Sequence, residues 1–262
     1  MKSKIHPPKM LDINRALSGI KALFFGPDNK RQRVLNEFVR LVAKILASNY
    51  VGESYKTWIA DEHFSKKFRE LSPHNYFSEE RKFALKEFSK SLKNTNGAIA
   101  ECGCYVGVSA WFVANELPDI DFYLFDSFEG LSEPGNHDQA PSGVYQWKKG
   151  DMQSTEDLIK ENLAEFPNIH IMKGWIPNRF SEIENLKFRL VHIDVDLYQP
   201  TFDSLIFFYG RISSGGMIIM DDYGFQNCPG AYKAANDFMA DKPEQIIHLP
   251  TGQGIIVRHC ET

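Results

Sequence analysis

The sequence predicts an α/β fold, in which helices cover both faces of a mostly parallel sheet. From residue 98 onward, short apolar segments of strand length alternate with segments of helical periodicity, and this alternation is typical of strand–helix–strand units. Four of the first five predicted strands end in an acidic residue or an acidic pair. Because ligands of such sheets bind outside the carboxyl ends of the strands, we expect a functional site at that edge.

Composition and charge are those of an ordinary globular protein and exclude several classes. A formal net charge of −4 over 262 residues argues against a nucleic-acid partner. No apolar run reaches the ~18 residues that predict a membrane span, and the basic N-terminus lacks the apolar core of a secretory signal. The four cysteines form no Cys-x-x-Cys pair, so we expect reduced thiols and a cytoplasmic location.

The N-terminal part of the chain reads differently from the rest. Residues 33–48 place apolar side chains at helical spacing, whereas residues 50–77 mix aromatic and charged side chains without a clear period. We therefore predict a helical extension at 1–75 and a second domain at 76–262. The apolar helices of the N-terminal extension would suit a homodimer interface.

The elements of the second domain follow in order from local signals. Ser78 is predicted to cap a helix that ends near Leu92 and buries Phe83, Phe88 and Leu92. The elements predicted after it are strands at 98–101, 122–125, 169–172, 189–193 and 217–220, helices at 108–117 and 200–212, and a hairpin of strands at 245–249 and 254–258.

A glycine-containing turn follows the first predicted strand and opens a helix. Its two glycines, Gly103 and Gly107, have the spacing Gly-x-x-x-Gly, which differs from the Gly-x-Gly-x-x-Gly pattern of dinucleotide enzymes. Glycine lets the backbone approach a ligand closely. Glu101 precedes the turn and would repel a phosphate but suit a cationic ligand. A plain strand-to-helix turn is the alternative interpretation.

An acidic residue follows the second predicted strand. Asp126 opens the segment Asp126-Ser127-Phe128-Glu129-Gly130, and an acid at this place commonly accepts hydrogen bonds from ribose hydroxyls. Together with the glycine-containing turn, Asp126 indicates a nucleoside-binding site. These residues alone are also compatible with NAD as the ligand. The alternative is an aspartate that caps a helix.

Four carboxylates follow two further strands. Asp194 and Asp196 come after the fourth predicted strand, and Asp221 and Asp222 come after the fifth. Neighbouring strands lie about 4.8 Å apart, so these groups should converge. Carboxylate oxygens suit Mg²⁺ or a similar hard ion, and one acid could act as a base. The alternative is a set of helix caps and solvated turn residues.

Other polar residues near the predicted strand ends are less informative. His192 lies within a buried strand, where a histidine with satisfied hydrogen bonds is the expected interpretation. Trp175 could stack on a base or belong to the core. The long polar segment 132–150, which includes His137 and Trp147, has the length of a lid or binding loop.

Taken together, these motifs resemble the macrocin O-methyltransferase (TylF) family of class I methyltransferases. The similarity covers residues 75–258 and is carried by Ile99 to Gly103, Phe125 to Leu131, Gly174 to Pro177, Val191 to Tyr198, Pro200-Thr201, and Gly215 to Gly224. It implies a Rossmann-like sheet of seven strands whose last strand is antiparallel, with S-adenosyl-L-methionine and Mg²⁺ as cofactors.

The resemblance also implies roles for individual residues. Asp194, Asp221 and Asp222 would be the metal ligands, and Asp196 or the metal-bound Asp194 would be the general base. The cofactor-binding residues would be Glu101, Gly103, Tyr105, Gly107, Ser109, Asp126, Ser127, Phe128, Gly174 and Trp175. Val106 and Val108 stand where the family commonly has Arg and Gly.

The predicted activity is that of an S-adenosylmethionine- and metal-dependent O-methyltransferase (EC 2.1.1.-). Its acceptor would be a hydroxyl of a sugar in a small-molecule glycoside or a polysaccharide. The main alternative is a metal-dependent nucleotide-sugar glycosyltransferase that uses Asp194-x-Asp196. A dehalogenase-like phosphatase and a non-enzymatic binding protein are further alternatives.

Overall fold

The computed structural model describes residues 61–73 and 78–259, together with a few single positions nearer the N-terminus. The chain divides into two compact units, residues 1–65 and 66–262. The helix predicted at 33–48 falls almost entirely outside the described residues, and the predicted boundary between 75 and 76 stays a prediction. In the described part of the chain, every helix is too short or too polar to cross a bilayer.

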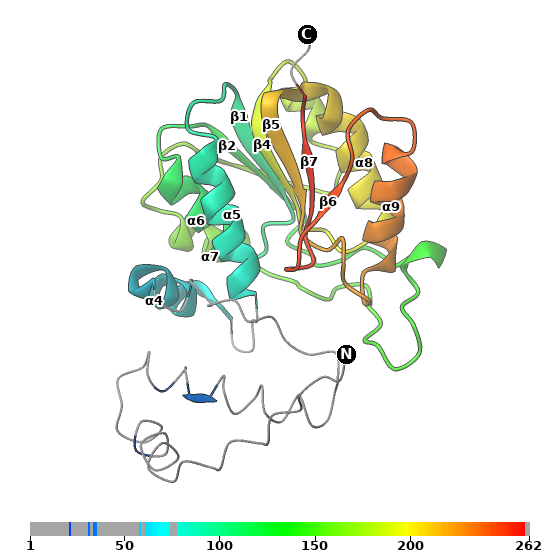
Figure 1. Ribbon diagram of the computed structural model, residues 1–262, viewed down its shortest axis with the longest axis horizontal. Helices are drawn as coiled ribbons and strands as arrows, with labels where there is room; N and C mark the ends of the chain where they lie inside the picture. The colour runs from blue at the N-terminus through cyan, green and yellow to red at the C-terminus, as the bar shows by residue number, and fades with distance from the viewer. Residues whose placement is uncertain are drawn as a thin grey trace, which may run out of the picture. The chain divides into compact units, whose positions relative to one another are not determined.

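A seven-stranded sheet forms the centre of the second unit (Figure 1). Its order is β3-β2-β1-β4-β5-β7-β6. The strands are β1 (Ala98–Cys102), β2 (Phe122–Asp126), β3 (Ile169–Lys173), β4 (Phe188–Ile193), β5 (Ile212–Met220), β6 (Ile247–His248) and β7 (Gly254–Val257). β1 to β5 are parallel, and β7 runs antiparallel to both of its neighbours. The predicted sheet with a reversed last strand is confirmed.

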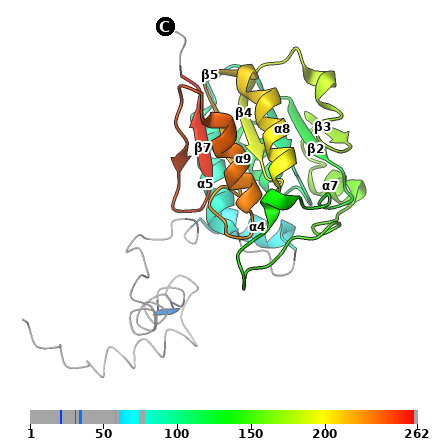
Figure 2. The ribbon, with the colours of Figure 1, turned by 90° about the vertical axis from the view of Figure 1, so that its right-hand side faces the viewer.

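Helices cover both faces of the sheet. Figure 1 shows α5 (Glu79–Ser91) and α6 (Val108–Glu116) on one face, and Figure 2 shows α8 (Tyr198–Phe208) and α9 (Pro229–Met239) in front of the other. Two further helices are α4 (Glu62–Leu71) and α7 (Glu156–Asn162). Helices on both faces explain why all six residues of β4 are buried.

Three parts of the predicted element order need correction, and the first is that α7 lies in a segment for which no helix was predicted. The fifth strand was predicted at 217–220, after a helix at 200–212, but β5 begins earlier, at Ile212, and includes residues 213–216. The N–H of Gly215 donates to the Arg258 carbonyl at 2.9 Å, and a register shift in β4 lets Ile212 pair with Phe188. Helix α9 was not predicted, because the dipeptide Pro229-Gly230 is typical of a turn. In the structure Pro229 begins the helix, a position that proline tolerates well.

A cluster of aromatic side chains fixes α8 against the sheet. The ring centroids of Phe125 and Phe180, and of Phe180 and Phe208, lie 5.0 Å apart in edge-to-face contacts. Phe188 of β4 contacts Phe208 of α8 at 5.1 Å. Aromatic pairs of this kind add to the free energy gained by burial. The packing places the N-terminus of α8 beside the end of β4, where the predicted site begins.

Candidate active site

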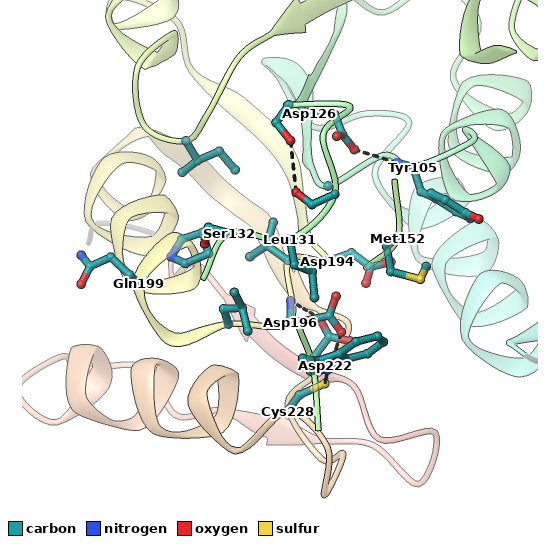
Figure 3. A pocket seen from close by; sticks show the side chains of 18 of the residues that line it. Tyr105, Asp126, Leu131, Ser132, Met152, Asp194, Asp196, Gln199, Asp222 and Cys228 are labelled. Carbon is teal, nitrogen blue, oxygen red and sulfur yellow. Dashed lines mark hydrogen bonds between the residues drawn. The ribbon is translucent and has the colours of Figure 1, made fainter. Parts of the chain in front are cut away.

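A cavity of about 700 Å³ opens at the carboxyl ends of the five parallel strands. Residues that follow each strand line it, as the topology of parallel sheets predicts. Those labelled in Figure 3 come from the ends of β1, β2, β4 and β5, from the segment between β2 and β3, and from the start of α8. The residues that line it from the strand ends are Gly103, Tyr105, Asp126, Ser127, Gly174, Trp175, Asp194, Asp196 and Asp222.

The turn after β1 is held by a close backbone approach and by Asp126. Gly103 has a φ of +82°, and a Cβ there would lie 1.9 Å from the Asp194 carbonyl oxygen. The Asp126 carboxylate accepts the N–H group of Cys104 at 3.0 Å and that of Tyr105 at 2.9 Å (Figure 3). Its other oxygen accepts the Phe128 N–H at 2.7 Å. Asp126 thus ties the turns after β1 and β2 together, and burial raises its pKa.

The predicted cofactor residues fall into two groups. Six of them line the cavity: Gly103, Tyr105, Asp126, Ser127, Gly174 and Trp175. Four lie behind its surface in the described structure: Glu101, Gly107, Ser109 and Phe128. Gly107 has a φ of +85° and precedes α6, so its role in the structure is to start that helix. Phe128 is buried with a φ of +60°.

Glu101 occupies a fully buried position behind the turn. Its Oε1 accepts hydrogen bonds from the Ser109 hydroxyl and from His192 Nδ1, the latter at 2.9 Å. Its Oε2 is buried and has no hydrogen-bond partner among the described residues. An unsatisfied buried carboxylate oxygen is costly, and none of the described residues donates to this atom.

His192 links this glutamate to the acidic pair after β5. Its side chain is 1% exposed, and its Nε2 lies 3.2 Å from Asp221 Oδ1. Burial lowers the pKa of the imidazole, but the hydrogen bonds to Asp221 and Glu101 outweigh burial and raise that pKa to about 10. The expected core histidine therefore lies between two carboxylates, with each ring nitrogen within hydrogen-bond distance of one of them.

Two basic side chains of α5 meet the predicted metal ligands. Lys82 Nζ lies 3.0 Å from Asp194 Oδ2 and 3.2 Å from Asp221 Oδ2. Arg81 donates to the same Asp221 oxygen and lies 3.9 Å from Asp222 Oδ1. Burial alone would raise the pKa of Asp221, but Lys82 and Arg81 hold it well below its ordinary value.

A second group of side chains surrounds Asp196. The Asp196 N–H donates to Asp222 Oδ2 at 3.0 Å, and the Cys228 thiol donates to Asp196 Oδ1 at 3.3 Å (Figure 3). Burial and the charge of Asp194 raise the pKa of Asp196 to about 7. Burial and the nearby carboxylates, led by Asp196, also raise the pKa of Asp222 well above its usual range. β4 ends at Ile193, so Asp194 and Asp196 both follow the strand, and both line the cavity.

The polar segment 132–150 contributes one wall of the cavity. Trp147 lines the cavity and donates its indole N–H to Cys228 Sγ at 3.4 Å. Asp138 is buried and accepts the Tyr198 N–H at 2.7 Å, which caps the N-terminus of α8. His137 packs on the ring of Tyr198 with centroids 4.6 Å apart and is not one of the lining residues.

Arg81, Lys82 and Cys228 were missed by sequence reasoning. The predicted buried face of α5 used Phe83 and Phe88, which are only half-buried, while the buried face contains Lys82, Leu85, Lys86, Ser89 and Leu92. A signal was present, because Ser78, Lys82, Leu85, Ser89 and Leu92 recur at helical spacing. A lysine within such a stripe indicates a buried charge with a partner.

Cys102, Cys104 and Cys228 are free thiols, as expected.

The sheet order and the position of the cavity define this protein as a class I methyltransferase in fold. The chain belongs to the macrocin-O-methyltransferase (TylF) family, whose model matches residues 37–248. The match begins well before β1 and so includes part of the segment that the sequence sets apart as an N-terminal extension. It leaves the glycosyltransferase alternative without support.

Curated relatives are similar over part of their length. Demethyldecarbamoylnovobiocin O-methyltransferase of Streptomyces niveus is 23% identical over 158 residues, which are 56% of this chain and 60% of the relative. Mycinamicin III 3''-O-methyltransferase of Micromonospora griseorubida is 23% identical over 154 residues, 54% of this chain and 61% of the relative. The chain thus matches little more than half the length of these relatives.

Solved structures share the fold. Calicheamicin methyltransferase CalS11 has a TM-score of 0.59 and 15% identity, and the alignment covers 79% of this chain and 95% of that one. The O-methyltransferase NovP has a TM-score of 0.57 and 19% identity, over 69% of this chain and 80% of that one. At these identities the likeness is one of fold.

Proposed function

We propose that this chain transfers the methyl group of S-adenosylmethionine to a hydroxyl of a sugar, in a small-molecule glycoside or a polysaccharide. The observation that carries the proposal is that a single cavity contains both the glycine turn after β1 and the carboxylate of Asp196. A methyl donor and an acceptor hydroxyl must meet in such a space. The names of the two relatives described above state that one acts on a novobiocin compound and the other on a mycinamicin compound.

The turns after β1, β2 and β3 fit the proposed cofactor. Gly103 lets the turn after β1 pass close to the backbone of Asp194, and the Asp126 carboxylate fixes the N–H groups of Cys104 and Tyr105. Glu101 does not line the cavity, and its hydrogen bonds with Ser109 and His192 hold the turn after β1 from behind. Bound S-adenosylmethionine would supply an electrophilic methyl group on a sulfonium. The predicted cofactor residues that lie behind the cavity would then act by holding this first layer.

Asp196 is the proposed general base. Its pKa of about 7 is set by burial and by Asp194, and a base whose pKa lies near the working pH is effective. The Asp222 carboxylate and the Cys228 thiol hold the residue in place. In the proposed step Asp196 takes the hydroxyl proton while the new oxygen–carbon bond forms. Bound S-adenosylmethionine would supply the methyl group and would leave as a neutral sulfide.

The predicted Mg²⁺ site does not fit the side-chain contacts that the structure shows. Oxygen ligands from Asp194, Asp221 and Asp222 would suit Mg²⁺ by their chemistry. However, the two Asp221 oxygens accept from His192, Gln253, Arg81 and Lys82, and Lys82 also holds Asp194. No step of the proposed reaction depends on an ion, and the metal dependence stays a prediction.

Methyl transfer from labelled S-adenosylmethionine tests the proposed function. The acceptor panel would contain deoxysugar glycosides, polysaccharide fragments and free nucleotide sugars. We expect label in at least one sugar acceptor, with S-adenosylhomocysteine released in equal amount. Hydrolysis or transfer from a UDP- or GDP-sugar, without binding of S-adenosylhomocysteine, would instead favour a glycosyltransferase. The predicted homodimer can be checked on the same preparation by light scattering.

A further inference from the structure

Lys82 is a fully buried ammonium at the centre of an acidic site. Its side chain is 0% exposed, and its Nζ lies within hydrogen-bond distance of carboxylates that follow two different strands, Asp194 and Asp221. Burial of an ammonium is very costly unless opposite charges surround it. The position of Lys82 therefore depends on these carboxylates, and its charge in turn neutralises them.

The backbone places the two carboxylates side by side. β4 and β5 are parallel neighbours with Ile193 opposite Met220, and the Asp221 N–H donates to the Ile193 carbonyl at 2.8 Å. Asp194 and Asp221 follow these residues directly, so their side chains share one edge of the sheet. Lys82 reaches that edge from α5 and bridges an oxygen of each. A divalent ion shared by the two acids would lie in the same place.

Asp221 has no oxygen left for a further cation within the described structure. Its Oδ1 accepts from Gln253 at 2.8 Å and lies 3.2 Å from His192 Nε2. Its Oδ2 accepts from Lys82 and Arg81. An ion that approached this carboxylate would face two positive side chains within a few ångströms, where charge repulsion is strong. It would also have to displace existing hydrogen bonds.

We propose that Lys82 takes the place of a divalent metal ion in this chain, so that the site binds no such ion and methyl transfer proceeds without one. The Lys82 ammonium bridges Asp194 and Asp221 and keeps the turn after β4 in position. Asp196 of the same turn then faces the cavity. The catalytic half of this inference rests on the proposed function, but the statement about metal binding does not.

Direct measurement of Mn²⁺ binding tests the inference, because Mn²⁺ suits the same oxygen ligands as Mg²⁺. Electron paramagnetic resonance would count bound Mn²⁺ in the wild-type chain, with and without S-adenosylhomocysteine. The variant Lys82→Met keeps the length of the side chain and removes its charge. We expect no bound Mn²⁺ in the wild-type chain, about one ion per chain in Lys82→Met, and turnover of the wild type that EDTA leaves unchanged.

The matched control is Lys90→Met on the same helix, where the lysine is exposed and pairs with Glu87. We expect this variant to behave as the wild type does. Stoichiometric Mn²⁺ in the wild-type chain would overturn the inference, as would a folded Lys82→Met variant that binds S-adenosylhomocysteine but no Mn²⁺. The wild-type arm decides the question even if Lys82→Met does not fold. Failure of every form to bind S-adenosylhomocysteine would count against the proposed function instead.

Discussion

Asp196 illustrates how much of this site depends on single side chains. Its φ of +58° is rare for a residue with a Cβ, and such conformations persist when neighbours hold them. Asp222 accepts the backbone N–H of Asp196, while the Cys228 thiol donates to its carboxylate. Trp147 in turn donates to Cys228. Asp196 is thus held by two direct contacts, one of them supported by Trp147, and it lines the cavity.

The variant Asp196→Asn keeps the size of the side chain and removes the base. Loss of general base catalysis typically costs about 10²–10⁴-fold in rate, and we expect a fall in kcat within this range. Affinity for S-adenosylhomocysteine, measured by calorimetry, should not change. Asp157→Asn is the control, since Asp157 is exposed in the first turn of α7. Wild-type turnover by Asp196→Asn would exclude Asp196 as the base.

At the scale of elements, the turn between β1 and α6 joins the two halves of the site. A close contact connects Gly103 to the backbone of Asp194, although the two residues follow different strands. The Asp194 N–H also donates to the Cys102 carbonyl at 2.8 Å. The turn after β1 and the turn that carries Asp196 therefore share one rigid contact. A change in the conformation of either turn should alter the conformation of the other.

The variant Gly103→Ala tests this contact against a matched glycine. Gly143 has a φ of +86°, and a Cβ added there would meet nothing within 4 Å, while Gly103 has a similar φ of +82°. Both alanine variants should lose about 1–2 kcal/mol to left-handed strain. We expect further loss of stability and of S-adenosylhomocysteine binding in Gly103→Ala alone, measured by urea unfolding and calorimetry. Equal effects in both variants would show that the contact has no role.

At the scale of the whole molecule, the cavity exists because five parallel strands end at one edge of the sheet. Its lining residues come from positions 81 to 228, so the pocket forms only when α5, the sheet and the segment 132–150 are all in place. A ligand that binds this cavity binds the folded state alone. Ligand binding and folding stability are therefore coupled.

The coupling gives a prediction for the intact chain. At a S-adenosylhomocysteine concentration 100 times its Kd, the free energy of unfolding should rise by about 2.7 kcal/mol. UDP with Mg²⁺ should leave it unchanged, because Glu101 and the acids of the cavity disfavour a diphosphate. Urea unfolding with each ligand measures both effects. Stabilisation by UDP with Mg²⁺ and not by S-adenosylhomocysteine would contradict the methyltransferase assignment.

The sequence by itself determined the sheet and the location of the site. Strand segments are short, apolar and followed by acids or glycines, and these signals are local. The rule that parallel strands end at one edge then places Gly103, Asp126, Asp194 and Asp222 together, as the structure shows. The same signals carried the family resemblance, which the family match confirmed.

Only the tertiary structure decided which charges meet. Lys82 is separated from Asp194 by 112 residues and from Asp221 by 139, and no local pattern records such pairs. Periodicity assigned the buried face of α5 to its phenylalanines, because a lysine is expected to be exposed unless its partner is known. The buried position of Glu101 and its bond to His192 depend in the same way on strands brought together by folding. Electrostatic partners are set by proximity in space, and proximity between distant segments is a property of the folded chain.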